Sequence, residues 1–329
     1  MSQAMEERSA TKSSSEAISS ESLDTDLISK LPTREVQSER LFLYKNFWFR
    51  QGFVERIMLL QGSFKARHDD IILATNPKCG TTWLKALAFT ITNRCHYDFG
   101  NHPLLTRHPQ EVIPTIDVEI PLNGDLTCIE KLPSPRILAT HMPFSLLPEP
   151  ISIQGCRIVY ICRDPKDAFV SRWHFVSEFF GEKNELNVAF NQFCEGISGY
   201  GPFWDHCLGY WRESITNSDR VLFLKYEEMM SEPVKFVKAL ASFLGAPFTS
   251  EEQDGGVPEE VVRLCSFKTL SGLNTSQTEV VQRGNVFVKK SAYFRRGEVG
   301  DWVNHISEEM GRKLDCIVEE KLKGSGLVF

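Results

Sequence analysis

The sequence lacks several features that would place it in a well-marked class of proteins. No stretch reaches the roughly 18 apolar residues that a membrane-spanning helix requires, and the formal net charge of −6 argues against general binding to nucleic acid. The nine cysteines are odd in number, contain no Cys-x-x-Cys pair and show no Cys/His spacing typical of zinc sites. We therefore expect free thiols, a cytoplasmic location, no metal, and no binding to membranes or nucleic acid.

The N-terminal stretch also lacks the marks of a targeting segment. It has no apolar centre such as a signal peptide requires, and its acidic residues are atypical of a transit peptide. Its Ser-rich composition offers little that could enter a packed core. The sequence therefore predicts a flexible tail over residues 1–30 and one domain over residues 31–329.

A strand, a tight loop and a helix are predicted in succession over Asp70–Leu87. Residues 71–74 are apolar and have the length of a buried strand, residues 75–80 contain Asn, Pro and Gly, and apolar side chains then return at helical spacing. Such a loop directs backbone N–H groups and the positive end of a helix dipole at one point, which suits a phosphate. The loop also supplies one cation and two hydroxyl groups, from Lys78, Thr81 and Thr82.

The order of residues in this loop differs from a Walker A motif. That motif places Gly-Lys-Ser/Thr after a first glycine and four further residues. Here the lysine precedes the glycine, and residues 77–83 read Pro-Lys-Cys-Gly-Thr-Thr-Trp. Without a Walker A motif, Asp164 after the apolar run 158–162 has no Mg²⁺ to hold. The loop therefore indicates a phosphate site of another kind.

Three further apolar segments, residues 136–140, 156–161 and 221–224, are predicted to be strands. Helices are predicted after Asp164, over residues 203–215 and 232–244, and from Ser307, with Asp164 and Ser231 as N-caps. Residues 99–132 show little periodicity and are predicted to be a loop over the sheet. The alternation of strands and helices predicts an α/β fold with a central parallel sheet flanked by helices on both faces.

Two further groups of residues suit an anion. Arg163 follows a predicted strand, and Ser171 lies about two helical turns further along, so both could contact one phosphate. Alternatively, Arg163 pairs with a neighbouring aspartate and Ser171 merely packs. Five cations without an acid fall between residues 283 and 296, namely Arg283, Lys289, Lys290, Arg295 and Arg296. They form either a solvated face or, with the flexible Gly297, an anion site.

Taken together, these segments resemble the soluble, cytosolic sulfotransferases from about Leu31 to the C-terminus. The loop is similar to the family's Pro-Lys-Ser-Gly-Thr-Thr-Trp sequence. The other motifs stand in the family's order: His141, Arg163-Asp164-Pro165 through Ser171, Tyr226-Glu227, Ser266-Phe267 and Arg295-Arg296-Gly297. Ala139-Thr140-His141 and residues 264–267 are similar to the plant branch of the family.

This resemblance implies a donor, an acceptor and a role for each motif. The donor would be 3′-phosphoadenosine 5′-phosphosulfate (PAPS), and the acceptor would be a hydroxyl of a small organic molecule, with no metal involved. The 5′-phosphosulfate would lie on the loop, at Lys78, Cys79, Gly80, Thr81 and Thr82. The 3′-phosphate would lie at Arg163, Ser171, Arg295, Arg296 and Gly297. Trp83, Tyr226 and Phe267 would surround the adenine, since bases stack on aromatic faces.

The resemblance also implies that His141 is the general base that removes the acceptor's hydroxyl proton. Elementary chemistry supports this role, because sulfuryl transfer needs an activated oxygen nucleophile and histidine titrates near neutral pH. Among the eight histidines, His141 directly follows an apolar strand, whereas others such as His68 lie in polar stretches. Lys78 would stabilise the charge that develops on the leaving phosphate oxygen.

The sequence departs from the family pattern at three places. Cys79 replaces the usual Ser, and it is either a reactive thiolate favoured by the helix terminus and Lys78 or a buried, inert substitute. Ala139 stands where animal members often carry a Lys, so a second catalytic cation is not expected. The animal dimer motif after Gly300-Asp301-Trp302 is not met, which leaves the oligomeric state open.

Two other classes of function compete with sulfuryl transfer. A nucleoside kinase or NTPase of the P-loop type would show Mg²⁺-dependent turnover of ATP, and a non-enzymatic nucleotide-binding protein would bind PAPS without turnover. The sequence leaves the acceptor open; the plant branch implies flavonoids, hydroxyjasmonates, brassinosteroids or desulfoglucosinolates.

Overall fold

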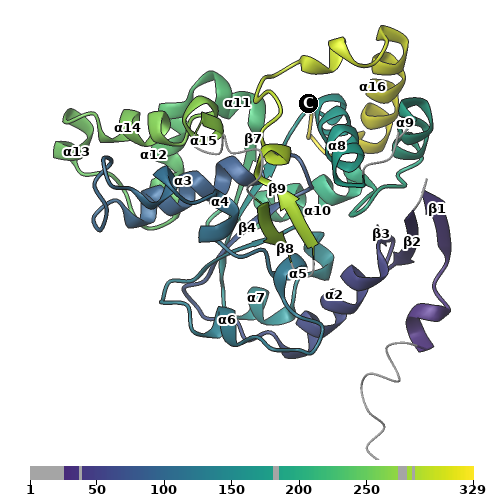
Figure 1. Ribbon diagram of the computed structural model, residues 1–329, viewed down its shortest axis with the longest axis horizontal. Helices are drawn as coiled ribbons and strands as arrows, with labels where there is room; N and C mark the ends of the chain where they lie inside the picture. The colour runs from purple at the N-terminus through teal and green to yellow at the C-terminus, as the bar shows by residue number, and fades with distance from the viewer. Residues whose placement is uncertain (1–25, 37–38, 181–184, 273–279, 284–285) are drawn as a thin grey trace, which may run out of the picture.

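Four parallel strands form the sheet at the centre of the molecule (Figure 1). They are β4 (Ile71–Thr75), β5 (Ile137–Thr140), β6 (Arg157–Cys162) and β7 (Val221–Lys225), in the spatial order β5-β4-β6-β7. In the register, Leu73 of β4 lies opposite Ala139 on one side and Val159 on the other. This computed structural model describes residues 26–329 except 37–38, 181–184, 273–279 and 284–285. The predicted parallel sheet is confirmed.

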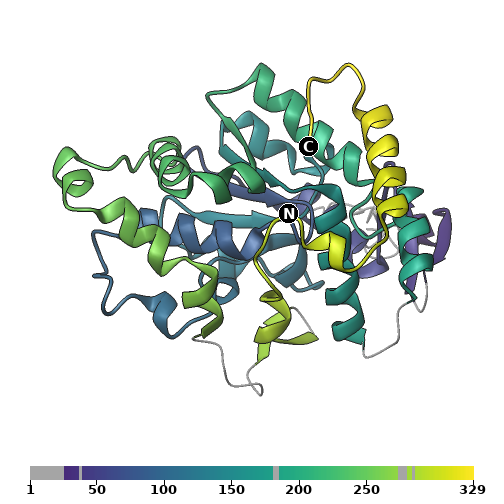
Figure 2. The ribbon, with the colours of Figure 1, turned by 90° about the horizontal axis from the view of Figure 1, so that it is seen from above.

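Helices cover both faces of this sheet, as the view from above shows (Figure 2). Ile71 and Leu73 pack in one apolar cluster with α3 (Thr81–Asn93) and α12 (Pro233–Phe243). Ile72 and Ala74 belong to the opposite cluster, which includes residues of α2 (Gln51–Ser63) and α10 (Phe203–Thr216). The alternation follows from the two-residue period of a strand, so a strand that is covered on both faces must be apolar throughout.

The remaining helices lie around this layered centre, with α12 to α15 at one end of the molecule and α8, α9 and α16 at the other (Figure 1). The longer ones are α8 (Pro165–Phe180), α9 (Leu186–Cys194), α14 (Val257–Leu264) and α16 (Glu308–Leu322). The shorter ones are α4 (Pro109–Val112), α5 (Ile116–Glu119), α6 (Thr127–Glu130), α7 (Glu149–Ile153), α11 (Tyr226–Ser231), α13 (Ser250–Asp254) and α15 (Phe267–Gly272). Single 3₁₀ turns are η1 (Pro103–Leu105), η2 (Phe144–Leu146), η3 (Lys290–Tyr293) and η4 (Asp301–Asn304).

Most predicted helix starts are confirmed, with one correction. The carboxylate of Asp164 accepts from Lys166 N at 2.8 Å at the start of α8, and the Ser307 side chain accepts from Met310 N at the start of α16. Ser231 does not cap α12, because it ends the preceding helix α11, where its hydroxyl donates to Glu228 O at 2.8 Å. The proline at position 233 begins α12, which suits the fixed φ of that residue.

Two smaller antiparallel sheets lie outside the central one. They are β1 (Thr33–Val36), β2 (Glu39–Tyr44) and β3 (Phe47–Phe49), and the hairpin of β8 (Val280–Arg283) and β9 (Val286–Lys289). The predicted loop over residues 99–132 contains η1, α4, α5 and α6, and its Pro114 O accepts from Ala139 N at 2.8 Å. Single helical turns are too short to show a period in the sequence, so the prediction of plain loop was wrong.

Most of the predicted tail lies outside the described residues. Residues 26–29 form a helical turn, and the Ile28 side chain is buried in the apolar cluster that contains α2. The last residues of the predicted tail therefore belong to the packed domain. Within the residues that the structure describes, no helix is both long and apolar enough to cross a membrane.

Candidate active site

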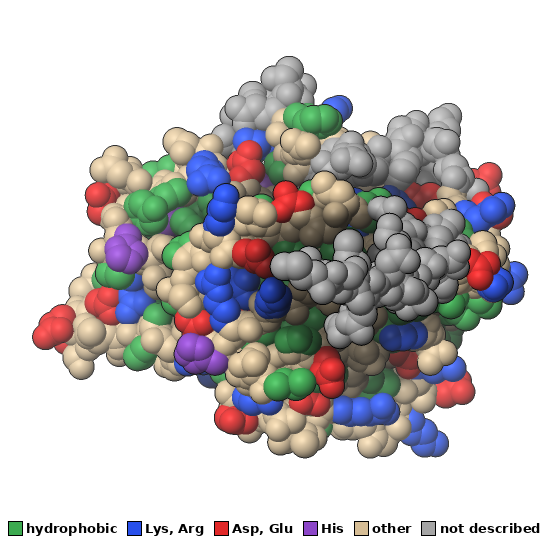
Figure 3. Space-filling model, turned by 90° about the horizontal axis from the view of Figure 1, so that it is seen from below, with side chains coloured by type: hydrophobic (Ala, Val, Ile, Leu, Met, Phe, Trp, Pro, Cys, Tyr) green, Lys and Arg blue, Asp and Glu red, His purple; other side chains and the backbone are tan. Residues whose placement is uncertain are grey.

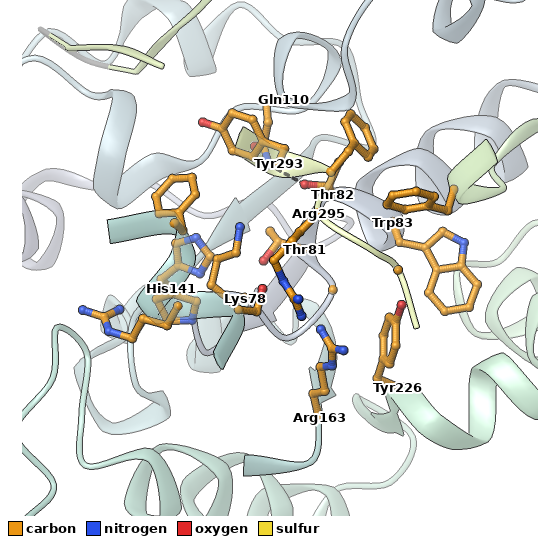
Figure 4. A pocket seen from close by; sticks show the side chains of 18 of the residues that line it. Lys78, Thr81, Thr82, Trp83, Gln110, His141, Arg163, Tyr226, Tyr293 and Arg295 are labelled. Atoms are coloured by element: carbon orange, nitrogen blue, oxygen red, sulfur yellow. Dashed lines mark hydrogen bonds between the residues drawn. The ribbon is translucent and has the colours of Figure 1, made fainter. Parts of the chain in front are cut away.

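A cavity of about 480 Å³ lies at the carboxyl ends of the parallel strands, the usual ligand-binding edge of such a sheet (Figure 4). The loop from Pro77 follows β4, His141 follows β5, Arg163 follows β6 and Tyr226 follows β7. Each strand end therefore delivers at least one side chain to the same space, although the four segments lie far apart in the sequence.

The structure brings nearly all of the predicted site residues to this cavity. The residues that line it include Lys78, Gly80, Thr81, Thr82, Trp83, His141, Arg163, Ser171, Tyr226, Phe267, Arg295, Arg296 and Gly297. Of the residues predicted to form the site, Cys79 alone does not line the cavity. In Figure 4, Lys78, Arg163 and Arg295 lie in the middle, with His141 on one side and Trp83 and Tyr226 on the other.

The loop after β4 is shaped by backbone conformations that are unusual for most residues. Lys78 and Gly80 have φ angles of 73° and 108°. A Cβ on Gly80 would lie 3.1 Å from the Tyr226 ring and 3.2 Å from Ile161, so the position needs glycine on both conformational and steric grounds. Thr81 Oγ1 lies 2.6 Å from Thr75 Oγ1, which joins the first residue of α3 to the last residue of β4.

Lys78 sits among aromatic rings and other cations. Its Nζ lies 4.1 Å from the centroid of the Phe175 ring and 5.9 Å from that of Tyr293. Burial, together with the positive charges of Arg163 and Arg295, lowers the pKa of Lys78 to about 7. An ammonium group in these surroundings gains from a nearby anion, so the site suits a phosphate or sulfate ligand.

Arg163 combines a structural pairing with a place on the cavity. Its guanidinium lies 3.3 Å from Asp167, donates to Glu298 O at 2.7 Å, and stacks 4.7 Å from the centroid of Tyr226. The pairing that we considered as an alternative to phosphate binding is therefore present. Nevertheless, Arg163 Nε is buried and has no hydrogen-bond partner among the described residues, and the same holds for Nε of Arg295. These orphaned donors fit an anionic ligand.

The segment 295–302 is fixed to α8 beside this guanidinium. Both carboxylate oxygens of Asp167 accept backbone N–H bonds, from Gly300 at 2.7 Å and Trp302 at 3.0 Å, and Arg295 pairs with Asp301. Gly297 has a φ of 69°, and a Cβ there would lie 2.4 Å from the ring of Phe267. The close contact places an aromatic face directly against the segment that was predicted to hold the 3′-phosphate.

The ring of His141 is held in one orientation. Its Nδ1 lies 2.9 Å from Thr75 O and 3.1 Å from Thr75 Oγ1. Since a carbonyl oxygen can only accept, Nδ1 carries the proton of the neutral ring. Nε2 then carries the lone pair, which is the state that a general base requires.

A buried polar network that sequence analysis missed holds the backbone of His141. Asp117 Oδ1 accepts from His141 N at 3.0 Å and from Thr140 Oγ1 at 2.8 Å, while its Oδ2 accepts from the Tyr200 hydroxyl at 2.6 Å. His206 Nε2 lies 2.9 Å from His141 O, and burial lowers the pKa of His206 to about 4, so the neutral ring donates to that carbonyl. In the sequence, the one sign of this network is an acidic residue, Asp117, between the apolar residues Ile116 and Val118.

The structure contradicts the idea of a reactive thiolate at Cys79. The side chain is fully buried in an apolar cluster, and burial raises the pKa of its thiol well above the usual value. Its backbone N–H donates to Asn76 O at 3.2 Å rather than facing the cavity. Desolvation of the side chain thus outweighs the field of the helix terminus, and Cys79 is a small, buried residue.

Other members of the predicted cation run do not form part of the cavity. Lys290 is buried and lies 3.6 Å from Glu111, Lys289 is exposed, and the side chain of Arg283 lies outside the described residues. Gln110 lines the cavity and was not predicted; its Nε2 donates to Thr82 Oγ1 at 3.2 Å. No group of three or more His, Cys, Asp or Glu side chains in the described parts of the chain could hold a metal ion.

Comparison with known proteins identifies this arrangement. Residues 68–326 match the sulfotransferase domain family. The chain belongs to the sulfotransferase family. It is 42% identical over 305 residues to Cytosolic sulfotransferase 8 of Arabidopsis thaliana, covering 92% of this chain and 91% of that protein. It is 44% identical over 289 residues to Cytosolic sulfotransferase 17 of the same plant, covering 87% and 83%. This sulfotransferase is thus of the plant cytosolic type.

Solved structures of sulfotransferases agree with this assignment. An Arabidopsis thaliana sulphotransferase superposes with a TM-score of 0.73 at 36% identity, covering 94% of this chain and 98% of that one. A mouse sulfotransferase, SULT7A1, complexed with PAP (PAPS without its sulfuryl group) has a TM-score of 0.68 at 26% identity, covering 87% and 95%. The protein is therefore a PAPS-dependent sulfotransferase that acts on small molecules, and not a P-loop kinase or a binding protein without activity.

Proposed function

We propose that this sulfotransferase transfers the sulfuryl group from PAPS to a hydroxyl of a small organic acceptor, with His141 as the general base. The observation that carries the proposal is the hydrogen bond of 2.9 Å from Nδ1 of His141 to Thr75 O. It leaves the lone pair on Nε2 of a ring that lines the same cavity as Lys78. The proposed base, His141, and the cation of Lys78 thus line the same cavity.

The residues of the cavity fit the proposed donor. Lys78, Gly80, Thr81 and Thr82 would hold its 5′-phosphosulfate, and Arg163, Ser171, Arg295, Arg296 and Gly297 would hold its 3′-phosphate. The buried Nε atoms of Arg163 and Arg295 supply donors that have no partner among the described residues. Trp83, Tyr226 and Phe267 would surround the adenine; the rings of Trp83 and Tyr226 lie edge to face, with centroids 5.5 Å apart. When bound, PAPS supplies the sulfuryl group on its 5′-phosphate.

The chain's own residues perform the proton chemistry and the charge stabilisation. Nε2 of His141 removes the acceptor's hydroxyl proton, and the Thr75 carbonyl stabilises the resulting imidazolium through the Nδ1 hydrogen bond. The Asp117 network fixes the backbone of His141, so the ring does not have to be ordered during the reaction. Lys78 stays protonated beside a bound anion and stabilises charge on the leaving phosphate oxygen.

The relatives and the molecular surface support proposals on the protein's location, acceptors and partners. Relatives that are named cytosolic sulfotransferases support a cytoplasmic location, and acceptors such as flavonoids, hydroxyjasmonates, steroids and desulfoglucosinolates remain candidates. Acidic and basic side chains are interspersed on the face shown in Figure 3, which supports the view that nucleic acid is not a partner. We propose that no metal takes part.

Transfer of ³⁵S from labelled PAPS to a panel of hydroxylated acceptors tests this function. The variant His141→Ala should lower turnover by roughly two to four orders of magnitude, because general-base catalysis contributes that much. Its affinity for PAP should equal that of the wild type. The exposed His96 provides the matched control, and His96→Ala should keep full activity. Near-normal turnover by folded His141→Ala would refute the role of the base.

A further inference from the structure

The acceptor end of the cavity carries more positive charge than a neutral alcohol or phenol needs. We infer that the acceptor is a hydroxylated carboxylic acid whose carboxylate binds at Arg172 and Arg56. The inference rests on the proposed function, in which the acceptor's hydroxyl lies at His141. It narrows the acceptor from any small hydroxyl compound to one that bears an anionic group.

The charged residues that line the cavity show this excess of positive charge. The described residues that line it include seven Lys or Arg residues and no Asp or Glu: Arg50, Arg56, Lys78, Arg163, Arg172, Arg295 and Arg296. Four of these, Lys78, Arg163, Arg295 and Arg296, belong to the proposed donor site. The donor's phosphates therefore account for four cations. Three arginines remain, of which Arg50 pairs with Glu39, so Arg56 and Arg172 are the candidates for a second ligand.

Arg172 is the least compensated of the three. It lies on α8 next to Ser171 and lines the cavity, and no carboxylate among the described residues forms an ion pair with it. Its guanidinium lies directly over Gly199, where a Cβ would be only 2.9 Å from one of its terminal nitrogens. Burial and the charge of Arg50 lower the pKa of Arg172 to about 10, although the negative charge of Glu39 acts in the opposite direction. The half-buried guanidinium of Arg172 therefore offers N–H donors to an anionic ligand in the cavity that it lines.

Arg50 and Arg56 approach the cavity from one face of α2. Arg50 precedes the helix, and Phe53 and Arg56 follow at intervals of three residues, so all three lie on the same side. Glu39 pairs with Arg50, whereas the bonds of Arg56 within the described part of the chain go to backbone carbonyls, Ile120 O at 2.8 Å and Gly52 O at 2.9 Å. Carbonyls hold Arg56 in place without neutralising it.

The positions of these cations suit a ligand whose hydroxyl is at His141. The guanidinium of Arg172 covers Gly199, and the ring of the next residue, Tyr200, has its centroid 5.5 Å from that of His141. Tyr200 is held by its hydrogen bond to Asp117 and packs on Phe53 with centroids 5.3 Å apart. Phe53, Val118 and Val176 add apolar walls. A single small molecule can therefore reach both the base and the arginine.

Guanidinium geometry favours a carboxylate as the anionic group. A planar guanidinium offers parallel N–H donors that match the two oxygens of a carboxylate, and such charge-assisted bonds are roughly twice as strong as neutral ones. A neutral acceptor of the same shape would leave the half-buried guanidinium of Arg172 without an anion. The site should therefore discriminate against esters more strongly than against changes in the apolar part of the acceptor.

Binding of matched acids and esters to the PAP complex tests the inference. A panel of aromatic and aliphatic hydroxycarboxylic acids, each with its methyl ester, would be titrated into the protein saturated with PAP by calorimetry. The same pairs would serve as acceptors with PAPS. We expect the best acids to exceed their esters by about tenfold to a hundredfold in affinity and in kcat/KM, the range for hydrogen bonds to a charged group.

Three variants assign the discrimination to the subsite. Arg172→Met should abolish the preference by weakening the acids while leaving the esters and PAP unchanged. Gly199→Ala keeps the charge but displaces the guanidinium, so it should reduce the preference as well. Arg312→Met removes an exposed arginine paired with Glu308 on α16 and should keep the preference.

The outcomes separate this inference from the proposed function. Equal binding of acids and esters by the wild type, or an acid preference that survives Arg172→Met, would overturn the anionic subsite. Dependence of turnover on His141 would stand in either case. Conversely, acid-selective binding that depends on Arg172 in the PAP complex supports the subsite even if His141→Ala were to retain activity.

Discussion

The protonation of Lys78 offers a test that follows directly from the charges around it. Burial and the nearby Arg163 and Arg295 lower its pKa to about 7, whereas a bound phosphate should raise that pKa again. The free protein holds the proton below pH 7 and loses it above, while the complex keeps it. PAP binding should therefore take up about 0.1 proton at pH 6, about 0.5 at pH 7 and about 0.9 at pH 8 through this residue.

The affinity for PAP must change with pH in the corresponding direction. Below pH 7 the free ammonium is already charged, so the Lys78 contribution is fully present. Above pH 7 each further unit costs about tenfold in affinity, equivalent to about 1.4 kcal/mol, until the pKa of the complex is reached. The lowered pKa of Lys78 also affects folding. Between pH 7 and 10.5, the pKa of lysine in the unfolded chain, the unfolded chain binds this proton and the free folded protein does not, so the free energy of unfolding should increase as the pH rises.

Calorimetry in two buffers of different ionisation enthalpy measures the proton uptake. Lys78→Met keeps much of the apolar stem but cannot titrate, so subtracting its uptake removes the contribution of the ligand's own phosphates. Lys78→Arg stays charged and should bind PAP with little dependence on pH between 7 and 9. Identical proton uptake by the wild type and Lys78→Met would refute the assignment of the proton to this residue.

Three further predictions concern the conformation of the site. Gly297→Ala should weaken PAP binding about tenfold or more, because the new Cβ would lie 2.4 Å from Phe267. Gly326→Ala is the control, since Gly326 has a similar φ of 77° but no atom close to the new Cβ, and it should leave PAP binding unchanged. Both variants should lose about 1–2 kcal/mol of folding stability, because alanine is strained in the left-handed backbone conformation. Asp117→Asn should lower kcat about tenfold without changing the Kd for PAP, since it loosens the backbone of the base; a change in that Kd alone would contradict this role. A mild thiol reagent should inactivate the wild type and Cys79→Ser at the same rate, because the thiol of Cys79 is buried. If PAP protects the wild type and Cys79→Ser resists the reagent, the thiol of Cys79 is reactive after all.

The central sheet and the donor side of the site were accessible to sequence reasoning for a physical reason. Strands covered on both faces must be apolar, so the runs at residues 71–74 and 221–224 are visible, and the residues that follow each run share one edge of the sheet. Lys78, His141 and Arg163 each stand directly after such a run or a few residues beyond it. Their convergence on one cavity follows from the parallel order of the strands.

The acceptor side could not be predicted in this way. Arg56 and Arg172 lie on helix faces that become part of the cavity only through the packing of α2 and α8, which no local pattern encodes. Asp117 lies in a single turn of helix, too short to show a period. The sequence did not decide whether the thiol of Cys79 is reactive. The helix terminus lowers the pKa of a thiol and desolvation raises it, and the direction of the side chain, which the fold sets, determines which effect is larger.

The proposed donor site is tested most directly by comparing the binding of PAP and AMP, which differ only in the 3′-phosphate. Arg163, Ser171, Arg295, Arg296 and Gly297 all line the proposed 3′-phosphate site, and Nε of two of the arginines is buried without a partner among the described residues. Removing the phosphate leaves these two buried Nε donors without an acceptor. We expect PAP to bind at least about a hundredfold more tightly than AMP, equivalent to about 2.7 kcal/mol, and to raise the Tm of the protein by a larger amount. Equal affinities and equal shifts of Tm for the two nucleotides would contradict this expectation.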